Sequence, residues 1–128
     1  MEIRTRNPAH GVYSATPDYV HAVEVRGAER LLFVAGTMGL DGEGRPGATL
    51  ELQLGLIWSN IRAILGSAGM TVDNIVRVTS YLRDSAYAEA NAAARVEALN
   101  GRAVATTAIV ARTLADEWLV EVEVIAAG

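Results

Sequence analysis

The sequence predicts an α+β fold in which two helices cover one face of a mixed β-sheet, with the element order β-β-α-β-α-β-β. Two segments repeat apolar residues or alanine at helical spacing, and five shorter segments are rich in the β-branched residues that favour strands. A length of 128 residues is that of one domain with one hydrophobic core. We therefore expect residues 1–128 to form a single domain.

The first two strands are expected at residues 19–25 and 31–38. Both segments are apolar, and the turn-forming sequence RGAE separates them. This arrangement predicts a β-hairpin. Residues 39–49 include four glycines and one proline, a composition that does not hold regular structure and predicts a loop.

The two helices are expected at residues 50–65 and 85–99. Apolar side chains in the first recur at positions i, i+3, i+4 and i+7, and Gly66 follows as a stop signal. The second is rich in alanine, and Asp84 precedes it as an N-cap residue. Between the two helices, residues 71–82 contain an alternating apolar pattern that predicts a strand.

The last two strands are expected in the sequences ATTAIVAR and WLVEVEVIA, which a polar turn would join into a second hairpin. Side chains alternate along a strand, so Val120, Val122 and Val124 should lie on one face and Glu121 and Glu123 on the other. Two helices cover only one face of such a sheet, yet the strands are apolar on both. We therefore expect a partner subunit to cover the second face.

The composition excludes several kinds of chemistry. The sequence has no cysteine, and all 11 basic residues are arginines, which excludes thiolate catalysis and a lysine Schiff base. The net charge is -4 and the arginines are scattered, so nucleic acid is not an expected partner. His10 and His21 lack the spacing of metal ligands. No segment has the length of a membrane span or the pattern of a secretion signal, which predicts a cytoplasmic protein with no membrane partner.

Glu121 is the strongest candidate for chemistry. A glutamate on a strand face is most often exposed to solvent and has only a structural role. If the face instead lines a cleft between subunits, a partly buried Glu121 could transfer protons. Gly36 is the second candidate, because glycine inside an apolar strand is unfavourable unless the strand bulges or a ligand approaches the backbone closely.

Several segments together resemble one known family. They are GVYS (11–14), FVAGTMGLD (33–41), SAGMTVDNIVRVTSYLRD (67–84) and VEVEVIA (120–126), with Gln53, Asn60 and Asn91 at matching positions. In this order they resemble the RidA family, also called YjgF or reactive intermediate deaminase. The resemblance implies a chorismate-mutase-like fold and a homotrimer, in which the sheets form a central barrel with small-molecule clefts between subunits. It also implies hydrolysis of enamines and imines, such as 2-aminoacrylate, without cofactor or metal.

The resemblance assigns roles to individual residues. Tyr13, Gly36 and Asn91 match positions that bind the ligand, and Glu121 matches the glutamate that activates water. The family's deaminases also have a P-A-R-S segment, whose arginine binds the substrate carboxylate, and Thr106 occupies that position here. A threonine hydroxyl supplies neither the charge nor the forked geometry of a guanidinium group. The substrate-binding set expected from the sequence is therefore Tyr13, Gly36, Asn91 and Thr106.

Two functions from different classes follow. The first is a hydrolase or deaminase of reactive enamines or imines, with an altered substrate because the clamp arginine is missing. The second is a non-catalytic trimer that binds a small metabolite or an enzyme of a metabolic pathway. Arg102 and Arg112 lie near Thr106 in the sequence, and either could replace the missing arginine. A third function, cleavage of RNA, conflicts with the acidic charge.

Overall fold

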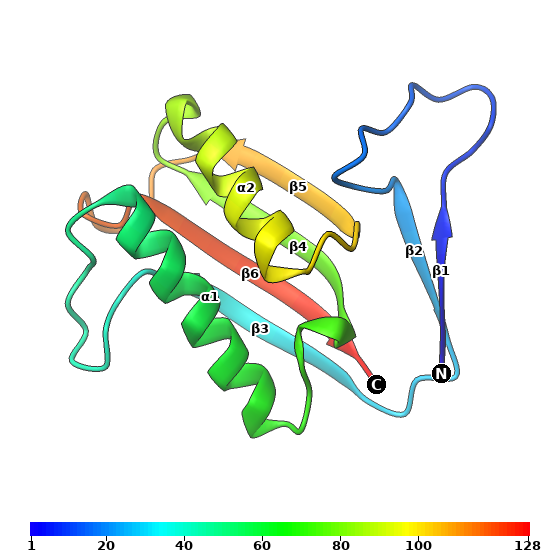
Figure 1. Cartoon of the computed structure of the whole chain (residues 1–128), viewed down its shortest axis with the longest axis horizontal. Helices are drawn as coiled ribbons and strands as arrows, with labels where there is room; N and C mark the ends of the chain where they lie inside the picture. Colours follow the sequence, from blue (N-terminus) through cyan, green and yellow to red (C-terminus); the bar gives the residue numbers. More distant parts are fainter.

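The computed structural model describes residues 1–128, and Figure 1 shows two helices lying on one face of a sheet. None of the helices is both long and apolar enough to cross a membrane. In chain order the elements are β1 Glu2–Arg6, β2 Ala22–Arg26, β3 Leu31–Met38, α1 Leu50–Ser67, β4 Ile75–Leu82, α2 Ala88–Ala98, β5 Ala105–Val110 and β6 Val120–Ala127. Short 3-10 turns at Val72–Asn74 and Ser85–Tyr87 precede β4 and α2.

The main sheet has four strands in the order β3-β6-β4-β5. Strand β6 is antiparallel to both of its neighbours, whereas β5 runs parallel to β4. The predicted hairpin of the last two strands is therefore wrong, because β4 lies between β5 and β6. Helix α2 makes the crossover that a parallel pair such as β4 and β5 requires, and the apolar β6 then returns to a position where both its edges are paired.

The predicted hairpin at the start of the chain is also wrong. Strand β2 pairs with β1, and these two form a separate antiparallel sheet beside the main one (Figure 1). The single mixed sheet expected from the sequence is thus divided. Strand β1 is too polar for an apolar pattern to reveal it, and in its register with β2 Arg4 lies opposite Glu24. An ion pair of 2.6 Å joins Arg6 to the same glutamate.

Both helices begin and end close to the predicted residues. The Thr49 side chain accepts a hydrogen bond from the backbone of Leu52 and caps α1. Asp84 caps the short turn that leads into α2 and accepts from Ala86 at 2.8 Å. The predicted strand at 71–82 begins later, since its first residues form a 3-10 turn with a capping box.

The core lies between the helices and one face of the main sheet. Ile57 and Ile61 of α1 are fully buried, as are Val120 and Val122 of β6. The alternation predicted for β6 is confirmed, because its valines lie in this core while Glu121, Glu123 and Ile125 remain half-buried on the opposite face. No helix covers that opposite face (Figure 1). The same face carries Phe33, which is 70% exposed. We call it the open face.

Candidate functional site

Glu121 and Gly36 lie against each other on the open face. Glu121 pairs with Met38 across β3 and β6, and the register of this pairing shifts between Val34 and Thr37. A β-carbon placed on Gly36 would lie 2.0 Å from the Glu121 Oε2 atom, which no real contact permits. Gly36 thus lies in an irregular part of the strand, and its missing side chain makes the space that the Glu121 carboxylate occupies.

A pocket of about 240 Å³ adjoins this contact. Its lining combines two carboxylates, a phenol and a guanidinium group with three smaller or apolar side chains. The lining residues are Tyr81, Ala111, Arg112, Thr113, Leu114, Glu121 and Glu123. We call this the Glu121 pocket. It brings together ionisable groups from two strands and from the loop that joins β5 to β6, which is the kind of convergence that supports proton transfer.

The two carboxylates of the Glu121 pocket differ in their partners. The Tyr81 hydroxyl donates to Glu123 Oε1 at 2.6 Å, and this hydrogen bond to the carboxylate, together with burial, raises the pKa of Tyr81 above its ordinary value of 10.0. Tyr81 therefore stays protonated at neutral pH, and its hydroxyl keeps Glu123 engaged as a hydrogen-bond acceptor. The Glu121 carboxylate accepts no hydrogen bond in the structure, so it is the one free to accept a proton or to hold water.

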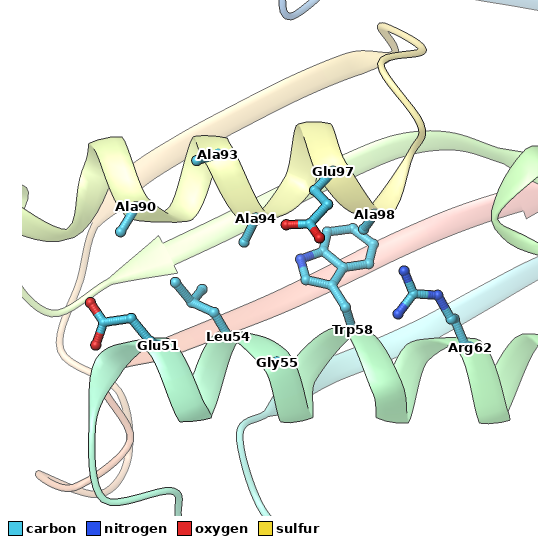
Figure 2. A pocket seen from close by; sticks show the side chains of 10 residues that line it. All are labelled: Glu51, Leu54, Gly55, Trp58, Arg62, Ala90, Ala93, Ala94, Glu97 and Ala98. Atoms are coloured by element: carbon cyan, nitrogen blue, oxygen red, sulfur yellow. The ribbon is translucent and has the colours of Figure 1, made fainter.

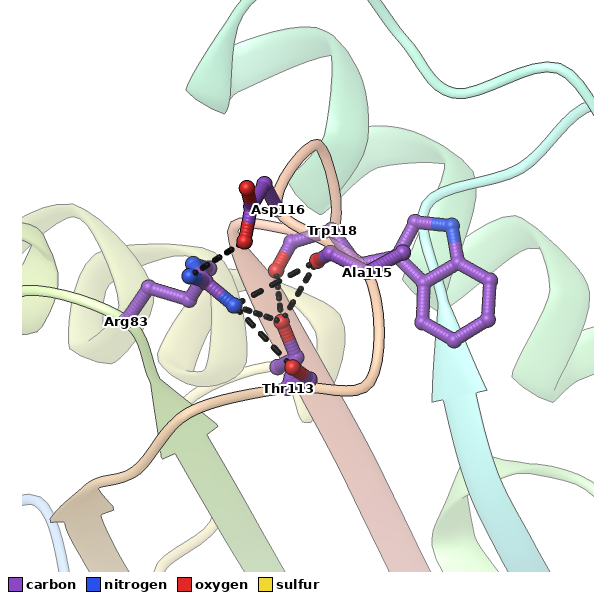
Figure 3. A network of polar contacts seen from close by, with 5 residues as sticks. All are labelled: Arg83, Thr113, Ala115, Asp116 and Trp118. Carbon is purple, nitrogen blue, oxygen red and sulfur yellow. Dashed lines mark hydrogen bonds and ion pairs between the residues drawn. The ribbon is translucent and has the colours of Figure 1, made fainter.

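A network around Arg83 holds the loop at the edge of the pocket (Figure 3). Arg83 Nη1 donates to the carbonyl and the hydroxyl of Thr113, both at 3.0 Å, and its Nη2 donates to Asp116 at 3.0 Å. The Thr113 hydroxyl lies 2.6 Å from the carbonyl oxygen of Trp118. From the other side, Gln53 of α1 donates to the carbonyl of Glu117 at 2.8 Å. Both Arg83 and Thr113 were missed from the sequence, where no spacing or motif distinguishes them.

Asn91 and Thr106 lie together elsewhere, on the helix side of the sheet near its β5 edge. They line a second pocket of about 250 Å³ with Asp18 and Arg95. Asn91 is 3% exposed, and the Thr106 hydroxyl donates to the carbonyl of Val104 at 3.0 Å. We call this the Asn91 pocket. Because Thr106 and Glu121 are on opposite faces of one sheet, a single chain does not bring them together.

The charge in the Asn91 pocket is already paired. Arg95 is 5% exposed and donates to the backbone oxygen of Asp18 at 2.6 Å and to its carboxylate at 2.8 Å. Hydrogen bonds from Thr16 and from Arg95 hold the pKa of Asp18 below its ordinary value of 3.8. The guanidinium group nearest to Thr106 in this pocket is therefore occupied.

Tyr13 lies in neither pocket. It is 77% exposed, and its ring meets the edge of the His21 ring with 5.0 Å between centroids. His21 also holds the loop, since its Nε2 lies 2.7 Å from the backbone oxygen of Tyr13. Within one chain the predicted site residues thus fall into three places: Gly36 with Glu121, Asn91 with Thr106, and Tyr13 alone.

A further hollow lies between the two helices, with a volume of about 420 Å³ (Figure 2). Leu54 and Trp58 of α1 face Ala94 and Ala98 of α2 across it. The Trp58 indole nitrogen is buried without a hydrogen-bond partner. None of the residues predicted from the sequence lines this hollow. Nowhere in the chain do three or more His, Cys, Asp or Glu side chains form a group that could hold a metal ion.

The chain matches one known protein family over most of its length. The sequence profile described as Endoribonuclease L-PSP matches residues 11–128. The chain belongs to this family, the RidA/YjgF family. A Rid-family protein of unknown function from Yersinia pestis, YyfB, is similar to this RidA/YjgF-family chain over 100% of both chains, with a TM-score of 0.85 and 27% identity. The structure of protein YjgH covers 99% of this chain and 97% of its own, with a TM-score of 0.69 and 30% identity.

Two curated relatives of this RidA/YjgF-family chain are also similar in sequence. The RutC family protein YjgH of Escherichia coli is 34% identical over 74 residues, which are 58% of this chain and 56% of that protein. A RutC family protein of Aquifex aeolicus is 40% identical over 67 residues, which are 52% and 51% of the two chains. The chain thus spans about half the length of the curated relatives it matches. The predicted family and its mixed α+β fold with two helices on one face are confirmed.

Proposed function

We propose that the protein hydrolyses small reactive imines and enamines to carbonyl compounds and ammonia, with Glu121 as the residue that activates water. The observation that carries this proposal is the Glu121 carboxylate itself. It lies in a pocket, accepts no hydrogen bond from the protein, and is held in a space that exists only because residue 36 is glycine. A carboxylate in this condition is suited to general base catalysis.

The reaction divides into steps that one carboxylate can serve. Water adds to the carbon of a protonated imine while Glu121 removes one proton from that water, which gives a neutral carbinolamine. The protonated Glu121 then returns the proton to nitrogen. The C–N bond breaks as the C=O bond forms, and the hydroxyl proton leaves with the nitrogen as ammonium. An enamine enters the same sequence once its β-carbon has taken up a proton and it has become an iminium ion.

We further propose that the working unit is a homotrimer of this single-domain chain. Two features support it. The open face leaves Phe33 and Ile109 exposed at 70% and 48%, although both are large and apolar. The Glu121 pocket and the Asn91 pocket lie on opposite sides of one sheet, so a cleft that holds both needs the open face of one subunit against the β5 edge of the next.

The substrate is expected to differ from that of relatives that carry an arginine at position 106. Thr106 is uncharged, and its hydroxyl donates to the carbonyl of Val104. Arg95 in the same pocket is paired with Asp18. The Asn91 pocket therefore offers polar but neutral contacts to the end of the substrate that enters it. Asn91, which is buried and has an amide able to donate and accept, is the residue we assign to that contact.

The test replaces the proposed base and compares it with its neighbour. Imines are generated in the assay mixture from a panel of amines and amino acids, and their decay is followed by absorbance. The rates are compared for the wild type, Glu121→Gln and Glu123→Gln. We expect Glu121→Gln to lose about 100-fold or more of the enzymatic rate. Glu123→Gln should lose much less, since Glu123 is engaged by Tyr81. Equal rates for the wild type and Glu121→Gln on every imine would contradict the proposal.

One observation favours a second function. The family's arginine position is occupied by Thr106, and loss of an anchoring charge would suit a trimer that binds a metabolite without converting it. Saturable binding of a keto acid or an imine, with no turnover and with no effect of Glu121→Gln on binding, would favour this function. Cleavage of RNA, the activity for which the Endoribonuclease L-PSP family is named, is the third outcome that the assay distinguishes.

A further inference from the structure

We propose that Arg112 is the anion-binding residue of the Glu121 pocket and determines which substrates the pocket accepts. This inference rests on the proposed function, since it assigns a role at the same site. Two opposite charges line this pocket without forming an ion pair. Arg112 and Glu121 line one pocket of about 240 Å³, yet no ion pair within 4.0 Å joins Arg112 to any carboxylate of the chain. A positive and a negative group therefore face the same small space without neutralising each other.

The other arginines near the two pockets already have hydrogen-bond partners. Arg77 lies beside Glu123 on the open face, and its Nη2 donates to the Thr107 hydroxyl at 3.4 Å. Arg83 holds the loop through Thr113 and Asp116, and Arg95 is paired with Asp18. Arg102 donates to the backbone oxygens of Val72 and Ile75, at 2.7 and 2.9 Å, and so has a structural role. Arg112 makes no hydrogen bond or ion pair in the structure.

The position of Arg112 is fixed although its side chain is free. On one side, the backbone nitrogen of Ala111 donates to the carbonyl of Leu82 at 2.9 Å. On the other side, Thr113 accepts two hydrogen bonds from Arg83 (Figure 3). With both flanking residues tied to the end of β4, the backbone of Arg112 is held at the mouth of the pocket. Only the side chain has to order when an anion binds, which reduces the entropy lost on binding.

The charges around the pocket explain why an anion would need this residue. Glu121 and Glu123 make the pocket acidic, so a carboxylate entering without a cation beside it would be repelled. A guanidinium group binds a carboxylate through two parallel hydrogen bonds and also orients it. With its anionic end on Arg112, a small molecule would direct its other end towards Glu121.

The experiment compares two imines that differ in one group, the imine of pyruvate and the imine of acetone. Arg112→Ala should raise KM for the charged imine by about ten- to hundred-fold, as expected for a lost charge-assisted contact, while kcat changes little. KM for the neutral imine should not change. Arg112→Lys should lie between the wild type and Arg112→Ala, because it keeps the charge and loses the fork. Arg62→Ala is the matched control, since Arg62 is an exposed arginine of α1 on the helix side of the sheet, away from the Glu121 pocket.

A direct binding measurement separates this inference from the proposed function. Binding of pyruvate to the purified protein is followed by NMR, which needs no turnover. Weaker binding in Arg112→Ala by tenfold or more, with Arg62→Ala like the wild type, supports the role of Arg112 even if no imine is hydrolysed. Unchanged binding in Arg112→Ala, an equal loss in both variants, or no binding by the wild type would overturn it. Thermal unfolding of each variant checks that the fold is kept.

Discussion

The two faces of the main sheet differ in how completely the chain itself covers them. On the helix side, Val120 and Val122 are fully buried beneath α1 and α2. On the open face, Glu121 and Glu123 alternate with those valines along the same strand, and Phe33 is 70% exposed. Both faces are built from one set of strands, so the difference arises from what packs on them.

The helix side therefore contributes mainly to stability, whereas the open face carries the groups proposed for catalysis. The helix side buries apolar area, which is the main source of folding free energy. The open face holds free charged groups in a pocket, and a carboxylate without a partner contributes nothing to folding. Substitutions on the two faces should therefore change different measured quantities.

The largest expected effect on stability is at Ile57, which is fully buried on the helix side. Ile57→Ala should lower the free energy of unfolding by about 2–5 kcal/mol, because it removes buried methyl groups and leaves a cavity. Urea denaturation measures this loss. The loss should not depend on protein concentration. Phe33→Ala on the open face is the matched substitution. It should shift the assembly towards monomer in light scattering, and an unchanged assembly would count against the open face as the trimer interface.

The next effect concerns the space beside Glu121. Gly36→Ala should lose about 100-fold of the imine-hydrolysing rate, similar to Glu121→Gln, because the new β-carbon forces the carboxylate to move. Enzyme assays check the rate. Gly55→Ala is the matched control, since a β-carbon there meets no atom within 4 Å. In the middle of α1 it should stabilise the protein by about 0.5–1 kcal/mol. Full activity in Gly36→Ala would show that the position of Glu121 is not critical.

A smaller loss is expected from the loop at the edge of the pocket. Arg83→Ala should lower the free energy of unfolding by about 1–3 kcal/mol, because it leaves the carbonyl of Thr113 without its charged donor. It should also raise KM for the charged imine, since Arg112 would lose its fixed backbone. Asp116→Ala removes only the 95% exposed end of the network and should be nearly neutral. Equal losses in the two variants would locate the stabilising contact at Asp116 instead.

The smallest effect is the pH dependence of the Asp18 and Arg95 pair. Hydrogen bonds from Thr16 and from Arg95 keep the pKa of Asp18 in the folded chain below its ordinary value of 3.8, so these contacts stabilise the fold at neutral pH. That contribution is lost as the pH falls below 3.8 and the carboxylate takes up a proton. The difference in unfolding free energy between the wild type and Asp18→Asn should thus be constant above about pH 5 and shrink in acid. A difference that grows in acid would contradict this assignment.

The features that could be predicted from the sequence are those with a local repeat. Helix α1 and the alternation along β6 follow from side-chain spacing, which the backbone geometry of each element determines by itself. Glu121 was identified in the same way, from its place on one face of a strand. Gly36 was identified because glycine is unfavourable inside a strand, and the structure places its missing side chain against Glu121.

Only the tertiary structure decided how these elements meet. The position of β6 between β3 and β4, and the pairing of β2 with β1, depend on contacts between segments that are distant in the sequence. The separation of Thr106 from Glu121 depends on which face of the sheet each strand presents. Only the fold shows that Arg112 is free whereas Arg83 and Arg102 are not. The hydrogen-bond partners of Arg83 and Arg102 lie some 30 residues away from them along the chain. Local spacing determines which way a side chain points along its own element, whereas the fold determines what it meets there.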